Sequence, residues 1–433
     1  MGRWLIVMAL VCLPLLAGCA RNPVSGERQL ALMSEADEIA KGEEVFPQYT
    51  NAYFGLFQDS DVQQLAQGIG AQVARVTQRQ NLKYEFNVVN HSEVNAFALP
   101  GGKITITRGL LTKMTTNAQL AGVLGHELAH VNARHHISSQ ARSTVTGLLL
   151  AVGQIYLASR GVRGAEFASV AGQLVAGLSL ASYSRDQERQ ADQLGLGYMT
   201  AAGYQPREYI GVLKLLLALQ EKEPDQVERL FMTHPLTTER IGNAESEIVR
   251  TPAMASPALA IDTTPFMAAT RKLRAAAPAF IFFDQGNEAT QQGKFPWAIS
   301  RYTEGLQEAP DQAIIWLGRA EAYLETNQLS EAEHDIAQAK RLYPELFYTR
   351  YFDGVLLCKQ RRWQASLEAL QAADKVVPDY PDAQFYMGFD YENLGQQRAA
   401  AQQYSAYLQS VTEGEKAQYA RRRLYDWGYL RTS

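Results

Sequence analysis

The sequence contains three cysteines among 433 residues, which excludes a scaffold held together by many disulfide bonds. It has no strong excess of either charge. The formal net charge is −4, so there is no electrostatic reason to expect nucleic acid as the main partner. With 46% hydrophobic and 20% charged residues, the chain shows no bias towards disorder. Its length allows two or three domains with proper cores.

The first twenty residues, MGRWLIVMALVCLPLLAGCA, have the pattern of an export signal. Arg3 precedes an apolar run that is too short for a typical membrane span, and small residues follow it. The letters LAGC at 16–19 resemble the bacterial lipobox, which predicts a signal peptide at 1–18 and a lipid on Cys19. The alternative is a plain cleavable signal. Because no Asp follows Cys19, known lipoprotein sorting implies a periplasmic protein anchored in the inner leaflet of the outer membrane.

The remaining cysteines leave no pair for a disulfide bond. Cys12 would leave with the signal peptide and Cys19 would carry lipid, so the mature chain would keep Cys358 alone. Several acyl chains on one cysteine would hold the protein firmly at the membrane, whereas one chain holds weakly.

Four of the seven histidines lie in the run LGHELAHVNARHH, residues 124–136. Good helix formers without proline surround this run, which predicts a helix. His126 and His130 are four residues apart and would share one helix face, where both imidazoles can bind one metal ion. Glu127 would lie beside a zinc ion, where a carboxylate can accept a proton from water that the metal has acidified. The alternative is a chance pattern on a solvated helix.

A catalytic zinc site needs a third protein ligand, and two candidates exist. His136 follows His130 by six residues, as in metzincins, but Ala133 stands where that pattern has Gly. An unbroken helix would turn His136 away from the metal. In SRDQERQAD, Glu188 and Asp192 are four apart on a second predicted helix. One carboxylate could bind the ion while the other orients a ligand histidine, although such a pair is often a solvated helix face.

Four motifs in order resemble the HtpX and CAAX-prenyl-protease type of gluzincin metallopeptidases: NAFALPGGKITITRGLL, HELAH, SRDQERQAD and THPLTTERI. The resemblance covers roughly residues 22–250. It implies that His126, His130 and Glu188 bind zinc. It also implies that Glu127 is the catalytic base and that Asp192 is a supporting carboxylate.

The alternating run in NHSEVNAFALPGG predicts a strand that enters a tight turn. By resemblance it is the edge strand near the cleft, where an extended substrate could pair with the backbone. Asn95 and Phe97 are therefore candidate substrate-wall residues. Alternatively, Phe97 belongs to the core and Asn95 caps the strand end.

His234 precedes a proline, which favours an extended loop. Such a histidine is often merely exposed. The resemblance implies that this loop covers the zinc, that His234 binds the metal as an inactivating switch or contacts the transition state, and that Arg240 pairs with a carboxylate of the site.

Residues 147–183 are rich in Gly, Ala and Leu. In membrane-integral relatives, comparable segments span the bilayer. Here each apolar run is shorter than the roughly 20 residues of a span, and Arg160 and Arg163 interrupt them. We expect buried helices or a mobile lid over the cleft.

The last third of the chain is periodic, with a spacing of 34 residues that is typical of tetratricopeptide repeats. Small residues recur where two helices should touch, and prolines recur where the second helix of each pair should end. The three series are Gly286, Ala320, Gly354 and Gly388; Ala298, Ala332, Ser366 and Ala400; Pro310, Pro344 and Pro378.

The sequence thus predicts a mainly α (α+β) fold. A signal peptide at 1–18 precedes a zincin-type helical peptidase domain with a small edge sheet at 19–250. A linker and connecting helix at 251–278 lead to an α-solenoid of tetratricopeptide repeats with a capping helix at 279–433.

We expect a lipid-anchored endopeptidase that holds one Zn²⁺ per chain and whose repeats recruit protein clients or an assembly machine. The domain order resembles that of periplasmic family members that act in β-barrel assembly, so unfolded or misassembled outer-membrane proteins are the expected substrates. One alternative is a periplasmic chaperone or scaffold with a latent or autoinhibited metal site. Another is a peptidase for lipidated or prenylated peptides, which export disfavours.

Overall fold

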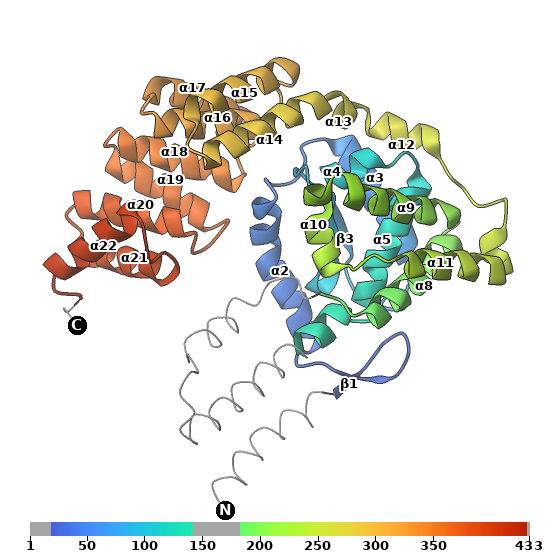
Figure 1. The fold of residues 1–433 in the computed structure, drawn as a ribbon. Coiled ribbons are helices and arrows are strands. Elements are labelled where there is room, and N and C mark those ends of the chain that lie inside the picture. Colours follow the sequence, from blue (N-terminus) through green and yellow to red (C-terminus); the bar gives the residue numbers. More distant parts are fainter. Residues whose placement is uncertain (1–18, 142–181, 431–433) are drawn as a thin grey trace, which may run out of the picture. The chain divides into compact units, whose positions relative to one another are not determined.

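The structure, a computed structural model, describes residues 19–141 and 182–430 (Figure 1). The predicted signal peptide lies outside the described residues, as does the stretch 147–181 with Arg160 and Arg163. The chain divides into two compact units, one of residues 1–46 and 60–271 and the other of residues 47–59 and 272–433. In the part of the chain that is described, no helix combines the length and apolarity that a membrane crossing requires.

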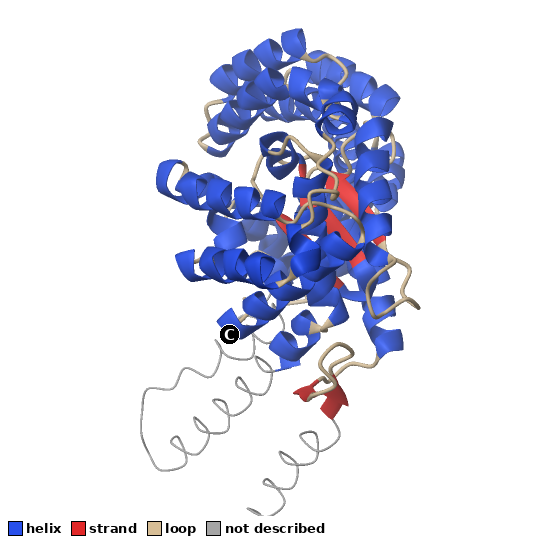
Figure 2. Ribbon diagram, turned by 90° about the vertical axis from the view of Figure 1, so that its right-hand side faces the viewer, coloured by secondary structure: helices blue, strands red, loops and turns tan. Residues whose placement is uncertain are grey.

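The first unit contains a small mixed sheet within a set of helices (Figure 2). Its strand order is β3 (Glu85–Val89), β5 (Lys103–Thr107), β4 (Ala96–Leu99), and β5 is parallel to β3 and antiparallel to β4. All residues of β4 and β5 are buried, so both faces of these strands are covered. β4 lies at one edge of this sheet, as the sequence predicted. A separate antiparallel pair joins β1 (Cys19–Arg21), which begins with the predicted lipidation site, to β2 (Arg28–Leu30).

Nine helices of the first unit lie wholly within the described residues, besides the short 3-10 turns. They are α2 (Glu35–Ala52), which continues into the second unit, α3 (Ser60–Ala74), α4 (Arg108–Lys113), α5 (Asn117–Asn132), α8 (Arg185–Ala201), α9 (Arg207–Lys222), α10 (Pro224–Thr233), α11 (Thr238–Arg250) and α12 (Thr263–Ala269).

Three of these helices, α5, α8 and α11, carry most of the candidate site residues, and each begins with a capping side chain. The Thr116 hydroxyl accepts a hydrogen bond from Gln119 N at 3.1 Å, and the Thr237 hydroxyl accepts one from Arg240 N at 3.3 Å. At α8, Ser184 and Gln187 form a reciprocal capping box. Local sequence therefore determines where each of these helices starts.

The expectation of an unbroken helix through Ala133 is wrong. Ala133 is the C-cap of α5, and Arg134 has a φ of 54°, in the left-handed region that disfavours residues with a Cβ. Helical conformation resumes at His135. Arg134 is held in this conformation by tertiary contacts, because its Nε donates to Glu38 Oε2 at 2.9 Å and its Nη2 to the Met33 carbonyl at 2.8 Å.

Glu38 is fully buried and pairs with two arginines. Arg79 donates to both carboxylate oxygens, at 3.0 and 3.2 Å, and to the Val131 carbonyl near the end of α5 at 2.9 Å. Burial alone would raise the pKa of Glu38, but hydrogen bonds and positive charge from His136 and Arg79 lower it to about 2. The cluster ties α2 to the C-terminal end of α5 and maintains the break at Arg134.

The described part of the second unit contains four helix pairs and a final helix, which confirms the predicted solenoid of tetratricopeptide repeats. The pairs are α14 (Ala277–Gln291) with α15 (Phe295–Glu308), α16 (Ala313–Glu325) with α17 (Leu329–Leu342), α18 (Phe347–Lys359) with α19 (Trp363–Asp374), and α20 (Pro381–Asn393) with α21 (Gln397–Ser410). The short α13 (Arg271–Ala275) precedes them and α22 (Glu415–Asp426) follows.

Small residues sit where the paired helices touch. A Cβ on Gly286 would come within 2.4 Å of the Tyr302 ring, and one on Gly388 within 2.7 Å of the Tyr404 ring. The predicted positions Ala298, Ala332 and Ser366 are all fully buried. The 34-residue series therefore mark helix contacts in the repeats.

The end of α2 and the loop after it pack with the repeats, which the sequence did not indicate. Asn51 Oδ1 accepts a hydrogen bond from Phe347 N at 3.1 Å. The Phe54 ring contacts Phe283 edge-on with 5.3 Å between centroids, and Leu56 N donates to the Tyr343 hydroxyl at 3.3 Å. Residues 47–59 thus form part of the second unit.

We predict that Glu38→Gln lowers the free energy of unfolding by about 3–5 kcal/mol, because it leaves two buried arginines without their carboxylate. Thermal and urea unfolding followed by circular dichroism would measure this loss. Glu35→Gln is the matched control: Glu35 pairs with the same Arg79 at 3.4 Å, but its side chain is 43% exposed, so its loss should stay below about 1 kcal/mol. Equal effects of the two changes would contradict this account of the cluster.

Candidate metal centre

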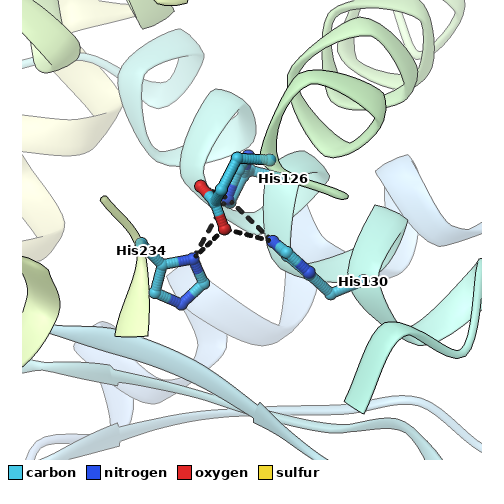
Figure 3. A group of neighbouring side chains, drawn as sticks. His126, His130 and His234 are labelled. Atoms are coloured by element: carbon cyan, nitrogen blue, oxygen red, sulfur yellow. Dashed lines mark hydrogen bonds and ion pairs between the residues drawn. The ribbon is translucent and has the colours of Figure 1, made fainter. Parts of the chain in front are cut away.

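Four side chains from three parts of the first unit meet at one point. His126 and His130 come from α5, Glu188 from α8, and His234 from the residue that follows α10. One ligand atom from each lies within 4.8 Å of the others, and all four residues are buried. Figure 3 shows the three imidazoles directed towards a common centre.

The distances between these atoms fit a tetrahedral metal site. Ligands bonded to zinc at 2.0–2.1 Å in a tetrahedron are about 3.3 Å apart. Here the separations are 3.1 Å for the Nε2 atoms of His126 and His130, 3.4 Å for His126 Nε2 and His234 Nδ1, and 3.3 Å for His130 Nε2 and Glu188 Oε1. Glu188 Oε1 lies 3.0 Å from His234 Nδ1. The donor set therefore fits a metal ion.

The helices α5 and α8 approach closely because glycine faces glycine between them. A Cβ on Gly125 would lie 3.0 Å from the Gly195 carbonyl oxygen, and one on Gly195 would lie 2.9 Å from His126 N. Larger residues would push the helices apart, and Glu188 would no longer reach the two histidines. The sequence analysis did not select either glycine, although Gly125 directly precedes the motif HELAH and Gly195 closely follows the motif SRDQERQAD.

Asp192 contacts the His126 imidazole on the side of the ring that faces away from the centre. His126 Nδ1 lies 3.1 Å from Asp192 Oδ1, a contact that favours the tautomer in which Nε2 is free to face the centre. Tyr209 on α9 donates its hydroxyl proton to the same carboxylate at 2.9 Å. Tyr209 was not a candidate, because nothing in its local sequence distinguishes it from a core tyrosine.

Arg240 bridges the two carboxylates of α8. Its Nε and Nη2 both donate to Asp192 at 2.7 Å, and its Nη1 lies 2.5 Å from Glu188 Oε2. Glu188 is therefore held through Oε2, while its Oε1 faces the histidines. The predicted pairing of Arg240 with a carboxylate of the site agrees with this geometry.

His135 supports the other ligand histidine, and the sequence analysis missed it. Its Nδ1 lies 3.0 Å from His130 Nδ1, and its Nε2 lies 2.8 Å from Gln190 Oε1. If His130 Nε2 faces a metal, His130 Nδ1 carries a proton and His135 Nδ1 accepts it, so His135 Nε2 carries the proton that Gln190 accepts. One tautomer of each ring satisfies every contact. Burial lowers the pKa of His135 to about 4, so the ring is neutral at pH 7.

The break at Arg134 explains why His135, and not His136, reaches the site. His136 Nε2 lies 3.5 Å from Glu38 Oε1 and is outside the group of four possible ligands. The sequence does show that His135 is five residues after His130. The direction of the His135 ring, however, depends on the helix break at Arg134, which the sequence did not predict.

The charged groups of the site are compatible with a bound cation. Burial works against ionisation of the two carboxylates, but His234, His126 and His130 lower the pKa of Glu188, and Arg240 and His126 lower that of Asp192. Conversely, burial lowers the pKa of His126, while Asp192 and Glu188 raise it to about 9. The two buried carboxylates thus face the Arg240 guanidinium and a proton on His126, and a bound divalent ion would take the place of that proton.

Glu127 lies next to this cluster without belonging to it. It is buried on α5, and its Oε1 is 3.8 Å from His234 Nε2. The Glu127 carboxylate lies beside His126 and His130 and is directed towards His234. This is the position expected for a base that acts on a molecule bound at the centre.

A mostly apolar cavity with about 430 Å³ of empty volume opens beside the cluster. Its wall includes His126, Glu127, His234 and Ala96 of β4, while most of the rest consists of Leu and Val side chains from α9 and neighbouring helices. Asn95 and Phe97 do not line it. Both are buried, and because side chains alternate along a strand, they lie on the face of β4 opposite to Ala96. The alternative in which Phe97 belongs to the core fits this placement.

Comparisons with known proteins agree with the two-part organisation. The model of peptidase family M48 matches residues 48–248, and a tetratricopeptide repeat model matches residues 289–345. The beta-barrel assembly-enhancing protease of Escherichia coli (strain K12) is 27% identical over 195 residues, which are 44% of this chain and 40% of that protein. Mitochondrial metalloendopeptidase OMA1 of Saccharomyces cerevisiae is 36% identical over 168 residues, 37% of this chain and 46% of the relative.

These matches span less than half of each relative's length. Among solved structures, the crystal structure of MamA aligns with 33% of this chain and 84% of its own, at 21% identity and a TM-score of 0.28.

We predict that His135→Phe weakens Zn²⁺ binding by roughly 10–100-fold, because Phe keeps the ring but cannot accept the His130 proton. Competition with a chromophoric chelator would measure the affinity. The NMR signal of the proton on His130 Nδ1 should also be lost or shifted.

The neighbouring His136→Ala is the control, since its ring faces Glu38 and not His130. His135→Asn, whose side-chain oxygen can accept the same hydrogen bond, should recover part of the affinity. Unchanged zinc affinity in His135→Phe would refute a positioning role.

Proposed function

We propose that the protein is a zinc-dependent endopeptidase of the bacterial cell envelope, because its residues 48–248 match the model of peptidase family M48. The observation that carries this proposal is the meeting of four ligand atoms at tetrahedral spacing directly beside the buried carboxylate of Glu127.

His126, His130 and Glu188 would hold the zinc ion, with Asp192 and His135 fixing the two imidazoles and Arg240 fixing Glu188. When bound, zinc would polarise the peptide carbonyl of a substrate and make water a stronger acid. The buried polar contacts of the two Nδ1 atoms, with Asp192 and His135, favour Nε2 atoms directed at the centre, so little reorganisation would be needed when the ion binds.

Glu127 is the proposed catalytic base. Its carboxylate would take the proton of the attacking water and return it to the amine that leaves when the peptide bond breaks. Burial beside an apolar cavity excludes bulk water, which strengthens each electrostatic contact that forms during the reaction.

His234 is the proposed switch. With its Nδ1 at 3.4 Å from His126 Nε2 and 3.0 Å from Glu188 Oε1, it stands where a fourth ligand would stand, and a site closed by four protein ligands leaves no position for water. We infer that the resting enzyme is inhibited by His234. Displacement of the loop after α10 would open the fourth position, and the freed imidazole could then stabilise charge in the transition state.

An extended polypeptide would bind along β4. Asn95 O accepts a hydrogen bond from Thr107 N of β5 at 3.0 Å, so Ala96 and Ala98 direct their backbone groups away from β5. Their positions support backbone pairing with a substrate strand, while Asn95 and Phe97 would set the twist and rigidity of this strand from its other face. The apolar cavity favours a hydrophobic side chain next to the cleaved bond.

We propose a periplasmic location, with lipid on Cys19 anchoring the chain to the inner leaflet of the outer membrane. Support comes from the lipobox-like sequence and from similarity to the beta-barrel assembly-enhancing protease of E. coli. Unfolded outer-membrane proteins are the proposed substrates. The tetratricopeptide repeats would recruit them or contact their assembly machinery.

The second candidate is a chaperone or scaffold in which the metal site is latent. The fourth ligand-like position of His234 favours it, since structural zinc sites are closed by four protein ligands. The adjacent Glu127 favours the peptidase, because a purely structural site has no use for a base.

We predict that Glu127→Gln keeps its zinc but loses roughly 10²–10⁴-fold in the rate of cleavage of an unfolded outer-membrane protein, because it removes the base and leaves every ligand in place. Gel-based proteolysis with metal analysis of the same samples would test this. Glu93→Gln, which changes a partly buried carboxylate away from the ligands, serves as the matched control. Full activity of Glu127→Gln would contradict the proposed mechanism.

We also predict that His234→Ala cleaves the same protein several-fold faster than wild type at equal zinc content, because the fourth position becomes available. The initial rates at several zinc concentrations separate faster chemistry from altered metal affinity. A slower variant would instead assign His234 to the transition state. If neither wild type nor His234→Ala cleaves any unfolded client, the scaffold function replaces the peptidase.

A further inference from the structure

The second unit has a cavity of its own, with about 530 Å³ of empty volume. Half of the residues that line it are aromatic and come from residues 47–59, α14, α18 and the start of α20: Phe54, Phe283, Tyr348, Tyr351, Phe352 and Tyr380. The lining also includes two carboxylates, Glu321 of α16 and Asp382 of α20.

The two carboxylates differ in their partners. Asp382 Oδ1 lies 2.8 Å from Lys416 Nζ, near the surface. Glu321 makes no hydrogen bond or ion pair with any residue of the part of the chain that the structure describes. Burial, together with the negative charges of Glu325 and Asp382, raises the pKa of Glu321 to about 7. A carboxylate that is desolvated and has no cation beside it is costly to the fold and favours a cationic guest.

Aromatic walls and a carboxylate together select a particular cation. The faces of tyrosine and phenylalanine rings attract positive charge, and a planar guanidinium can stack on a ring while it pairs with a carboxylate. The same unit already uses this chemistry internally: Arg319 lies 5.1 Å from the Trp316 ring centroid and pairs with Asp335 at 2.7 Å. The cavity offers aromatic rings and a carboxylate, as Trp316 and Asp335 do for Arg319, but no arginine is among its lining residues.

A polypeptide segment already reaches this cavity. Residues 47–59 pack in the second unit, where Phe54 contributes a wall and Asn51 accepts a hydrogen bond from Phe347 N at 3.1 Å. The repeats therefore accommodate a chain that is not part of their helix pairs, directly beside the open space.

We propose that this cavity binds the basic side chain, preferably arginine, of an extended segment of another protein, with Glu321 as the counter-ion and the tyrosine rings as the stacking surface. This gives the repeats a defined recognition element for clients. It deepens the recruiting role in the proposed function but does not depend on metal chemistry, and it can be tested in a chain that does not cleave.

The test uses the full chain with Glu127→Gln, so that no probe is hydrolysed. Two fluorescein-labelled peptides, Ser-Gly-Phe-Arg-Phe-Gly-Ser and the same peptide with citrulline in place of arginine, differ in charge but hardly in shape. Fluorescence anisotropy should show at least about tenfold tighter binding of the arginine peptide, since citrulline keeps the shape but lacks the charge that the ring faces and the carboxylate attract. Free arginine should compete weakly.

Added to that chain, Glu321→Gln should reduce the affinity for the arginine peptide to that for the citrulline peptide. Glu325→Gln is the matched control, because Glu325 is one turn further along the same helix and exposed. Tyr348→Leu should weaken the arginine peptide more than the citrulline peptide.

Equal binding of the two peptides, or no effect of Glu321→Gln, would overturn the proposal. Free arginine that binds as tightly as the peptide would overturn its polypeptide part. Circular dichroism of each variant would show that the repeats remain folded. Because these measurements involve no cleavage, their failure is distinguishable from failure of the proposed peptidase.

Discussion

The site of the first unit depends on how closely α5 and α8 can approach. Two helices with ordinary side chains at their contact are held 8–10 Å apart, and the glycines at 125 and 195 remove the side chains at the crossing. Glu188 can then reach His126 and His130 from the neighbouring helix. The HExxH pattern places two imidazoles on one face, and this contact adds the carboxylate that completes the candidate metal site.

Around that contact, buried polar groups fix the ligands from outside. Asp192 orients His126, His135 orients His130, and Arg240 restrains Glu188. Each of these groups is itself paired, so the cost of burying polar atoms is offset by hydrogen bonds. A ligand set held in this way would keep its geometry if the loop that carries His234 moved, so the proposed regulation by that loop is compatible with a rigid site.

The second unit follows a different rule. Glycine, alanine and serine at intervals of 34 residues let paired helices touch, and the stacking of pairs creates an inner surface that no single pair possesses. Aromatic residues from α14, α18 and α20 meet there with Glu321. Since these residues are not adjacent in sequence, their common cavity exists only in the folded repeats.

Regular features of the sequence determined the repeats, the HExxH helix and the carboxylate helix, because each rests on local periodicity or on spacing within one helix. Pairing of Arg240 with a carboxylate was expected from family resemblance, and the geometry agrees. The break at Arg134, the support of His130 by His135 and the packing of residues 47–59 with the repeats were decided by tertiary structure alone. Their cause is contacts between residues far apart in sequence, such as Glu38 with Arg134, whose energy offsets local conformational preference and leaves no periodic trace in the chain.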